Sequence, residues 1–161
     1  MRTFLAATIG ILLGAVVVGV LLWTLRPSPR EPFESGTVER VIDGDTVELA
    51  SGERVRYLGL DTPELLPEPD CGATDATELN RALVEGKRVE LLRGPDDRDQ
   101  FGRLLRYVFV DGIFVNAELI HEGMAQPQGF HPDERFRQVL VQMAVAARAA
   151  GRGLWAVCDW R

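Results

Sequence analysis

Residues 41–47 read Val-Ile-Asp-Gly-Asp-Thr-Val, and residues 56–64 read Arg-Tyr-Leu-Gly-Leu-Asp-Thr-Pro-Glu. In both stretches strand-forming residues lead into a segment rich in carboxylates, which is typical of a strand that ends in a turn. Gly44 and the pair Ser51-Gly52 supply turns between runs of β-branched and aromatic residues. We therefore expect three short consecutive strands, at residues 36–42, 45–50 and 53–60.

The rest of the chain alternates between helical and extended patterns. A helix is expected at 72–86, ending at Gly86, because glycine favours the left-handed conformation at a helix C-terminus. Two further strands are expected at 87–92 and 104–110 with a polar loop between them, a helix at 114–122, and a last helix from about Asp133. The last helix has one apolar stripe: Phe136, Val139, Leu140, Met143, Ala144 and Ala147. Five strands with helices inserted late predict an α+β fold, a small closed barrel with helical flanks.

An apolar segment opens the chain. The 23 residues at 3–25 are uncharged and mostly apolar, and as a helix they are about 35 Å long, enough to cross a bilayer. No small-residue cleavage site follows them, so an uncleaved signal anchor at 1–26 is expected, with membrane contact through residues 3–25. A Pro-rich linker at 27–34 and one domain at 35–161 complete the predicted organisation.

The two cysteines bear on the compartment. Cys71 and Cys158 are the only cysteines, and both follow the apolar segment. An even pair in an exported domain favours a disulfide, and with it a single-pass, membrane-anchored protein whose domain is extracytoplasmic. The alternative is a pair of reduced thiols in a cytoplasmic domain. Basic residues lie at both ends of the apolar segment, so their distribution does not decide the orientation.

Charge limits the class of partner. The net charge is −6, and the chain beyond Arg30 is more acidic still, because Arg2, Arg26 and Arg30 precede all 24 acidic residues. Proteins that bind nucleic acid without sequence preference usually present a basic face. A polyanion would therefore have to be held here by a local cluster and a metal ion.

Three aspartates are candidate metal ligands. Asp43, Asp45 and Asp61 lie at the ends of neighbouring predicted strands, so two of them can converge on one cation. Carboxylates with a backbone carbonyl suit Ca²⁺ better than Mg²⁺, and zinc is disfavoured because no His or Cys lies nearby. An EF-hand is excluded, since the twelfth position from Asp43 is Arg54, where a bidentate Glu is required. Taken alone, Asp-Gly-Asp also fits a simple hairpin turn.

Glu64, Arg56 and Arg103 are candidate catalytic residues. Glu64 lies three residues after Asp61, so one carboxylate can bind the metal while the other acts on a water molecule. The two arginines are permanently charged and can hold phosphate oxygens. The alternatives are a helix start for Asp-Thr-Pro-Glu and surface ion pairs for both arginines. Together the residues indicate phosphodiester chemistry.

Five motifs resemble the staphylococcal nuclease, or thermonuclease, family over nearly all of residues 36–156. They are the two stretches quoted first, Asp-Gln-Phe-Gly-Arg at 99–103, Asp-Gly-Ile-Phe-Val-Asn at 111–116 and Gly-Leu-Trp at 153–155. The resemblance implies an OB-fold barrel with three helices and Ca²⁺-dependent endonucleolytic cleavage of DNA and RNA to products with 3′-phosphates.

The resemblance also implies roles for individual residues. Asp45 and Asp61 would bind Ca²⁺ through their carboxylates, and Thr62 through its carbonyl. Arg56 and Arg103 would hold the phosphate, and Glu64 would act on the attacking water. No protein partner is implied.

Some positions depart from the family pattern. Residues 126–131 read Gln-Pro-Gln-Gly-Phe-His where substrate-stacking tyrosines are expected, so that Phe130 alone is left to replace one of them. Gln100 replaces a common Lys, and the domain is acidic. The alternative function is therefore a non-catalytic nuclease-like module that binds nucleic acid or protein. Asp45, Asp61, Glu64, Arg56 and Arg103 are all present, whereas modules of that kind typically lose one of these groups.

Overall fold

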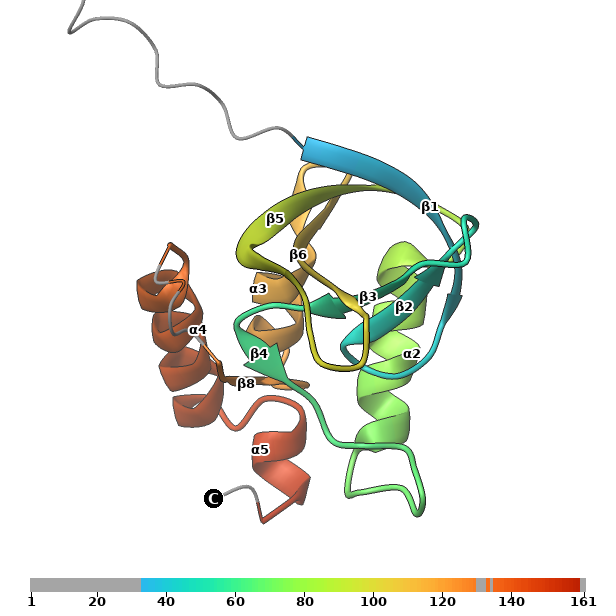
Figure 1. Cartoon of the computed structure of the whole chain (residues 1–161). Coiled ribbons are helices and arrows are strands. Elements are labelled where there is room, and N and C mark those ends of the chain that lie inside the picture. Colours follow the sequence, from blue (N-terminus) through green and yellow to red (C-terminus); the bar gives the residue numbers. More distant parts are fainter. Residues whose placement is uncertain (1–32, 130–132, 134, 160–161) are drawn as a thin grey trace, which may run out of the picture. The chain divides into compact units, whose positions relative to one another are not determined.

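A closed barrel of five strands forms the centre of the computed structural model, which describes residues 33–129, 133 and 135–159 (Figure 1). Its strands are β1 (Phe33–Val41), β2 (Thr46–Leu49), β3 (Arg54–Tyr57), β5 (Arg88–Arg98) and β6 (Leu104–Val110). They pair in the order β3-β2-β1-β5-β6, and parallel pairing of β3 with β6 closes the barrel. The predicted α+β fold with a five-stranded barrel is confirmed.

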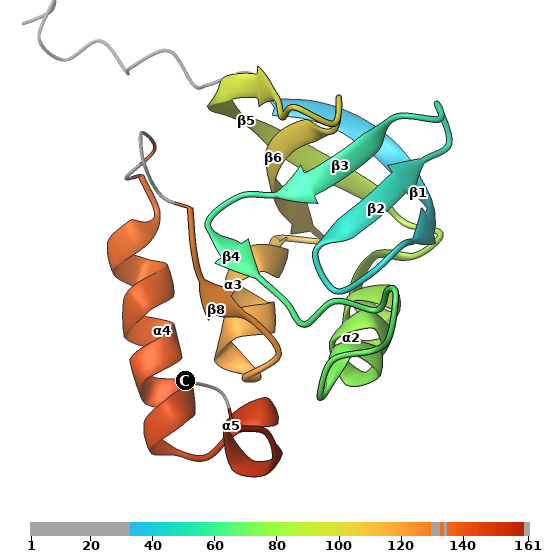
Figure 2. The same ribbon diagram turned by 60° about the horizontal axis from the view of Figure 1, so that its bottom comes forward.

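The helices lie outside the barrel. They are α2 (Ala73–Val84), α3 (Val115–His121), α4 (Arg137–Ala149) and the short α5 (Leu154–Val157). Figures 1 and 2 show α3 between α2 and α4, with α5 close to the end of the described chain. The first three helices were predicted, whereas α5 was missed because its four residues show no helical periodicity.

Short strands position the segment that follows the barrel. The predicted strand at 53–60 is divided: β3 ends at Tyr57, and β4 (Leu60–Asp61) pairs instead with β8 (Gln126–Pro127). Gly59 makes this turn possible, since its φ of 76° lies in the left-handed region. Asn116 donates a 2.8 Å hydrogen bond to the Leu58 carbonyl and so fixes the turn. A further short strand, β7 (Ile113–Phe114), extends the sheet beyond β6.

Alternating side chains fill the barrel. In β3, Val55 and Tyr57 are buried while Arg54 is exposed, which is the period of two expected for a strand with one face on the core. The core includes Val38, Val47, Leu91, Val108, Leu119 and Leu140. Each such side chain stabilises the fold by about 1.5–3 kcal/mol when it leaves water.

Strand β5 is longer than the predicted 87–92. It continues to Arg98 through a register irregularity between Arg93 and Arg98, which accommodates Gly94-Pro95. The buried guanidinium of Arg106 secures this extension, since its Nη2 lies 2.8 Å from Asp97 Oδ1 and its Nε lies 3.0 Å from Glu34 Oε2. Long-range ion pairs of this kind have no local sequence signal.

Helix α4 begins at Arg137, later than the predicted Asp133, whose carboxylate instead binds the Arg135 guanidinium at 2.7 Å. Leu140, Ala144 and Ala147 are buried as predicted. Val139 is 44% exposed, so its assignment to the buried stripe was wrong.

The N-terminal predictions fall largely outside the described residues. The expected anchor at 1–26 and most of the expected linker at 27–34 are not described, but Phe33 and Glu34 belong to β1 rather than to a linker. Within the described residues no helix combines the length and hydropathy that a membrane crossing requires.

The predicted disulfide is confirmed. Cys71 and Cys158 are bonded, with Cα atoms 5.9 Å apart. The bond joins the segment before α2 to the segment after α5. It links two parts of the chain separated by 87 residues.

Candidate active site

Asp45 lies at the turn between β1 and β2, and its side chain is only 5% exposed. Its carboxylate accepts hydrogen bonds from Thr46 Oγ1 (3.0 Å) and from the backbone nitrogen of Thr62 (3.2 Å). These contacts bring together the two stretches of sequence that carry the predicted metal ligands. They also satisfy a carboxylate that burial would otherwise leave without partners.

Gly44 allows this approach. A Cβ atom at Gly44 would lie 2.6 Å from Thr62 Oγ1, closer than side chains tolerate. Asp43 also caps the turn, because its Oδ1 accepts from the backbone nitrogen of Asp45 at 3.0 Å. The hairpin-turn interpretation of Asp-Gly-Asp is therefore correct for the local structure, and the turn holds Asp45 against Thr62 as well.

Arg56 lies between the two predicted metal carboxylates. Its Nη2 is 3.1 Å from Asp45 Oδ2 and 2.7 Å from Asp61 Oδ1, while its Nη1 donates to the carbonyls of Tyr57 and Leu60. Asp45 and Asp61 thus converge on one point, as predicted, and in this structure the cation at that point is a guanidinium. No helix start follows Asp61, since α2 begins only at Ala73.

The pKa of Asp45 reflects its burial among other charged groups. The pKa of Asp45 is raised to about 7, chiefly by burial and to a smaller extent by the charges of Asp43 and Asp61, while Arg56 opposes the rise. The Arg56 guanidinium therefore does not fully offset the effects of burial and of the neighbouring carboxylates on the pKa of Asp45. A further cation at this point would favour the ionised form of Asp45.

Arg103 reaches the same region from the loop between β5 and β6. Its Nε forms a 2.7 Å ion pair with Asp99 Oδ2, and its Nη1 lies 3.4 Å from Thr46 Oγ1. Asp99 Oδ1 also accepts from the backbone nitrogens of Phe101 and Arg103, which shapes the loop. Thr46 thereby contacts both Asp45 and Arg103.

Glu64 extends from the segment after β4. Partial burial raises the pKa of its carboxyl, the charges of Asp43 and Asp61 add to the rise, and Arg56 and Arg103 oppose it. Glu64 lines one groove together with Asp61 and Thr62. Glu64 and Arg103 also line one open hollow.

A cleft of about 320 Å³ connects the two arginines. Arg56 and Arg103 both line it, together with Asp99 and Phe101. Phe101 is 73% exposed, and its ring lies 5.5 Å from the Arg103 guanidinium carbon. The structure therefore brings all six predicted site residues into one region, with both guanidiniums on a single cleft.

Sequence reasoning missed three supporting residues: Thr46, Asn80 and Asp99. Asn80 is fully buried and joins Tyr57 Oη (3.0 Å) to the Asp43 carbonyl (3.0 Å). The sequence could have indicated Asn80, because it is a polar residue at a position of the predicted helix 72–86 where the helical periodicity calls for an apolar side chain. For Asp99 and Thr46, the only indication in the sequence was that they belong to the quoted motifs.

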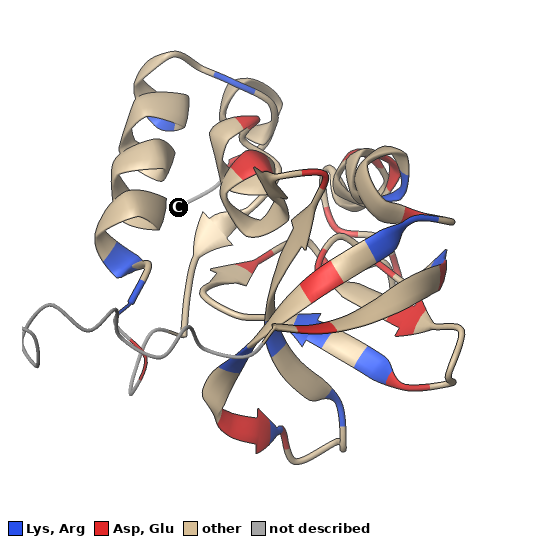
Figure 3. Ribbon diagram, turned by 90° about the horizontal axis from the view of Figure 1, so that it is seen from above, with Lys and Arg blue, Asp and Glu red and all other residues tan. Residues whose placement is uncertain are grey.

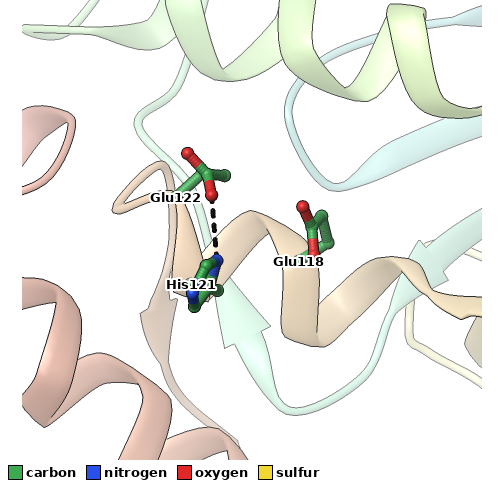
Figure 4. Close-up of side chains that lie close together, drawn as sticks. All are labelled: Glu118, His121 and Glu122. Carbon is green, nitrogen blue, oxygen red and sulfur yellow. Dashed lines mark hydrogen bonds and ion pairs between the residues drawn. The ribbon is translucent and has the colours of Figure 1, made fainter.

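A second group of possible ligands lies on α3. One ligand atom each of Glu118, His121 and Glu122 falls within 4.8 Å of the others, and the three are half-buried (Figure 4). His121 Nδ1 and Glu122 Oε1 are hydrogen-bonded at 2.9 Å. Their mutual bond accounts for their proximity without a metal ion.

Charges of both signs occur together on the barrel. Figure 3 shows acidic and basic residues on the same strands. Examples are the ion pairs of Arg40 with Glu48 (2.9 Å) and of Arg98 with Glu53 (2.7 Å). The barrel surface therefore has no continuous positive region that would attract polyanions within the described residues, in agreement with the net charge of −6.

Comparison with protein families gives a match to the staphylococcal nuclease homologues over residues 54–157. This chain belongs to that family. The matched region contains Arg56, Asp61, Glu64 and Arg103, whereas Asp45 lies just before it.

Three relatives illustrate the range of similarity. A thermonuclease of Staphylococcus intermedius is 29% identical over 163 residues, covering 92% of this chain and 96% of the relative. Endonuclease YncB of Bacillus subtilis is 40% identical over 97 residues, 56% of this chain and 46% of the relative, so the chain spans less than half of that protein. An uncharacterized endonuclease of Escherichia coli is 34% identical over 129 residues, 77% of this chain and 78% of the relative.

Proposed function

We propose that this protein is a Ca²⁺-dependent endonuclease that hydrolyses phosphodiester bonds of DNA, RNA or both to products with 3′-phosphates. One observation carries the proposal: the Arg56 guanidinium contacts both Asp45 and Asp61. Arg56 also lines the same cleft as Arg103. Similarity to proteins named thermonuclease and endonuclease supports it.

Ca²⁺ fits the donor atoms at this point. Asp45 and Asp61 provide carboxylate oxygens, the backbone of Thr62 is bonded to Asp45 and its carbonyl is the proposed third ligand, and no nitrogen or sulfur ligand is in the set. Burial, with a smaller contribution from Asp43 and Asp61, raises the pKa of Asp45, and a divalent cation bound there would favour the ionised carboxylate. When bound, Ca²⁺ supplies polarisation of the phosphate and orientation of a water molecule.

The protein's own residues do the rest. Arg103 holds the phosphate in the cleft, and Arg56 does so when the cation takes over its contacts with Asp45 and Asp61; both guanidiniums stabilise the charge that develops on the phosphate oxygens. Asp99 keeps the Arg103 side chain oriented through the Nε ion pair. Glu64 accepts a proton from the attacking water, or orients that water, and a carboxyl with a raised pKa suits the first role.

The test is digestion of fluorescent DNA and RNA oligonucleotides with Ca²⁺ and with a chelator. Cleavage should occur in Ca²⁺ and not in the chelator, and end-labelling should show that the products carry 3′-phosphates. Binding of the oligonucleotide without cleavage would favour the non-catalytic module instead.

We further propose that residues 1–26 anchor the protein in a membrane as a single-pass helix and that the domain is extracytoplasmic. The apolar run and the disulfide support this location. The full chain should stay with membranes after carbonate extraction, and protease added to spheroplasts should degrade the domain. Protection of the domain from the protease would contradict an extracytoplasmic location.

A further inference from the structure

The loop from Glu64 to Cys71 connects the proposed base to the disulfide, and the proposed function assigns it no role. Figure 2 shows this loop between β4 and α2. A polar groove of about 400 Å³ is lined by Glu64, Asp70 and the disulfide between Cys71 and Cys158. Asp61 and Thr62 line the same groove. The disulfide therefore lies beside the proposed metal ligands and the proposed base.

Glu64 and Asp70 are joined by two hydrogen bonds. The backbone nitrogen of Glu64 donates to Asp70 Oδ2 at 3.1 Å, and the backbone nitrogen of Asp70 donates to the Glu64 carbonyl at 2.9 Å. The two bonds close the loop into a ring. They fix the backbone of Glu64, from which its side chain extends, and the carboxylate of Asp70 makes one of them.

Asp70 is in turn held by rigid neighbours. Its carbonyl accepts a 3.1 Å hydrogen bond from the nitrogen of Ala73, the first residue of α2. The next residue along the chain, Cys71, is bonded to Cys158. Gly72 packs so closely on Leu154 that a Cβ atom there would lie 2.1 Å from Leu154 Cδ2. Asp70 is thus connected to α2 and to the end of the described chain.

We infer that Asp70 is a positioning residue: its carboxylate holds the Glu64 backbone so that the Glu64 carboxylate faces the reacting water. The inference rests on the proposed function, in which Glu64 acts on that water. Displacement of a reacting group by about 1 Å can cost about 10²-fold in rate. The loss belongs in kcat, because within the described residues Asp70 forms no hydrogen bond or ion pair with the phosphate-holding arginines or with the carboxylates of the proposed metal site.

The experiment compares Asp70→Ala with Asp70→Asn by steady-state cleavage of an oligonucleotide in saturating Ca²⁺. Alanine removes the acceptor, and kcat should fall about 10- to 100-fold with KM and Ca²⁺ affinity unchanged. Asparagine keeps an oxygen acceptor for the Glu64 nitrogen without the charge, so it should restore turnover to near that of the wild type. Restored turnover in Asp70→Asn would show that Asp70 acts through its hydrogen bond to the Glu64 nitrogen and not through its negative charge.

A matched control comes from the same loop. Glu68→Ala also removes one exposed carboxylate, but Glu68 forms no hydrogen bond or ion pair within the described residues. Its turnover should equal that of the wild type.

A double variant separates positioning of Glu64 from general destabilisation. If Asp70 acts through Glu64, then Glu64→Gln/Asp70→Ala should be no slower than Glu64→Gln alone, since the second change has nothing left to misplace. When Glu64→Gln alone is slower than the wild type, wild-type turnover in Asp70→Ala or additive losses in the double variant would overturn the inference. If Glu64→Gln is as active as the wild type, the proposed role of Glu64 is wrong and the inference falls with it.

Discussion

The backbone nitrogen of Thr62 donates a 3.2 Å hydrogen bond to Asp45 Oδ2, across 17 residues of sequence. This bond joins the turn after β1 to the segment after β4, and with it the two motifs that carry the proposed metal ligands. It holds the Thr62 backbone against the Asp45 carboxylate, and the proposal assigns both residues to the same ion.

Replacing the catalytic candidates should abolish turnover without unfolding the domain. Glu64→Gln and Arg103→Ala should each reduce kcat by about 10²- to 10³-fold, because each removes a group that acts on charge in the transition state. Circular dichroism checks the fold. Arg40→Ala is the control, since Arg40 is an exposed arginine whose ion pair with Glu48 is screened by water. Wild-type rates in both active-site variants would refute the assignment.

Metal binding should depend on the two converging carboxylates. Asp45→Asn and Asp61→Asn should each weaken Ca²⁺ binding measured by calorimetry, because each replaces an anionic oxygen ligand by a neutral one. Zinc should not support cleavage, since the site offers no nitrogen or sulfur ligand. Unaltered Ca²⁺ affinity in both variants would place the ion elsewhere.

The contribution of Asp45 to the stability of the metal-free protein should fall as pH rises from about 4 to about 7. Burial and neighbouring carboxylates raise the pKa of Asp45 to about 7, so the folded protein retains a proton that the unfolded chain releases above about pH 4. The proton-bound folded state is therefore favoured at low pH, and this contribution is lost as pH approaches the folded pKa. Asp45→Asn should remove this part of the slope.

Thermal denaturation in chelator between pH 4.5 and pH 8 measures the effect. Ca²⁺ binds the ionised carboxylate, so it should raise the melting temperature more at pH 7.5 than at pH 5. Identical pH profiles for the wild type and Asp45→Asn would show that Asp45 does not titrate in this range.

Breaking the disulfide should destabilise the domain. Cys71 and Cys158 close a loop with a sequence separation of 87, for which the chain-entropy model gives about 4 to 5 kcal/mol as an upper value. Urea denaturation of Cys71→Ser/Cys158→Ser measures the loss. Thiol titration of the denatured, unreduced wild type should find no free thiol, and two free thiols in material from the exported fraction would contradict the bond in the native protein.

Local patterns were enough to predict much of the fold. The alternation of Val55 and Tyr57 with charged residues predicted β3, and Gly86 predicted the end of α2. The disulfide could be predicted because two cysteines permit only one pairing. The strand extension to Arg98 could not, since the Arg106 guanidinium that secures it comes from another strand.

The sequence by itself determined which chemical groups the protein has: the carboxylates of Asp45, Asp61 and Glu64, the guanidiniums of Arg56 and Arg103, and one possible disulfide. It did so because strand periodicity and motif spacing are local. Only the tertiary structure decided how these groups are held.

The placement of Arg56 between two aspartates, and the double hydrogen bond between Glu64 and Asp70, are examples. Hydrogen bonds and ion pairs of polar residues have no periodicity of their own. Arg56 and Asp45 become neighbours only when the strands of the barrel pair, and the ring of Glu64 and Asp70 forms only when the loop between them folds back on itself.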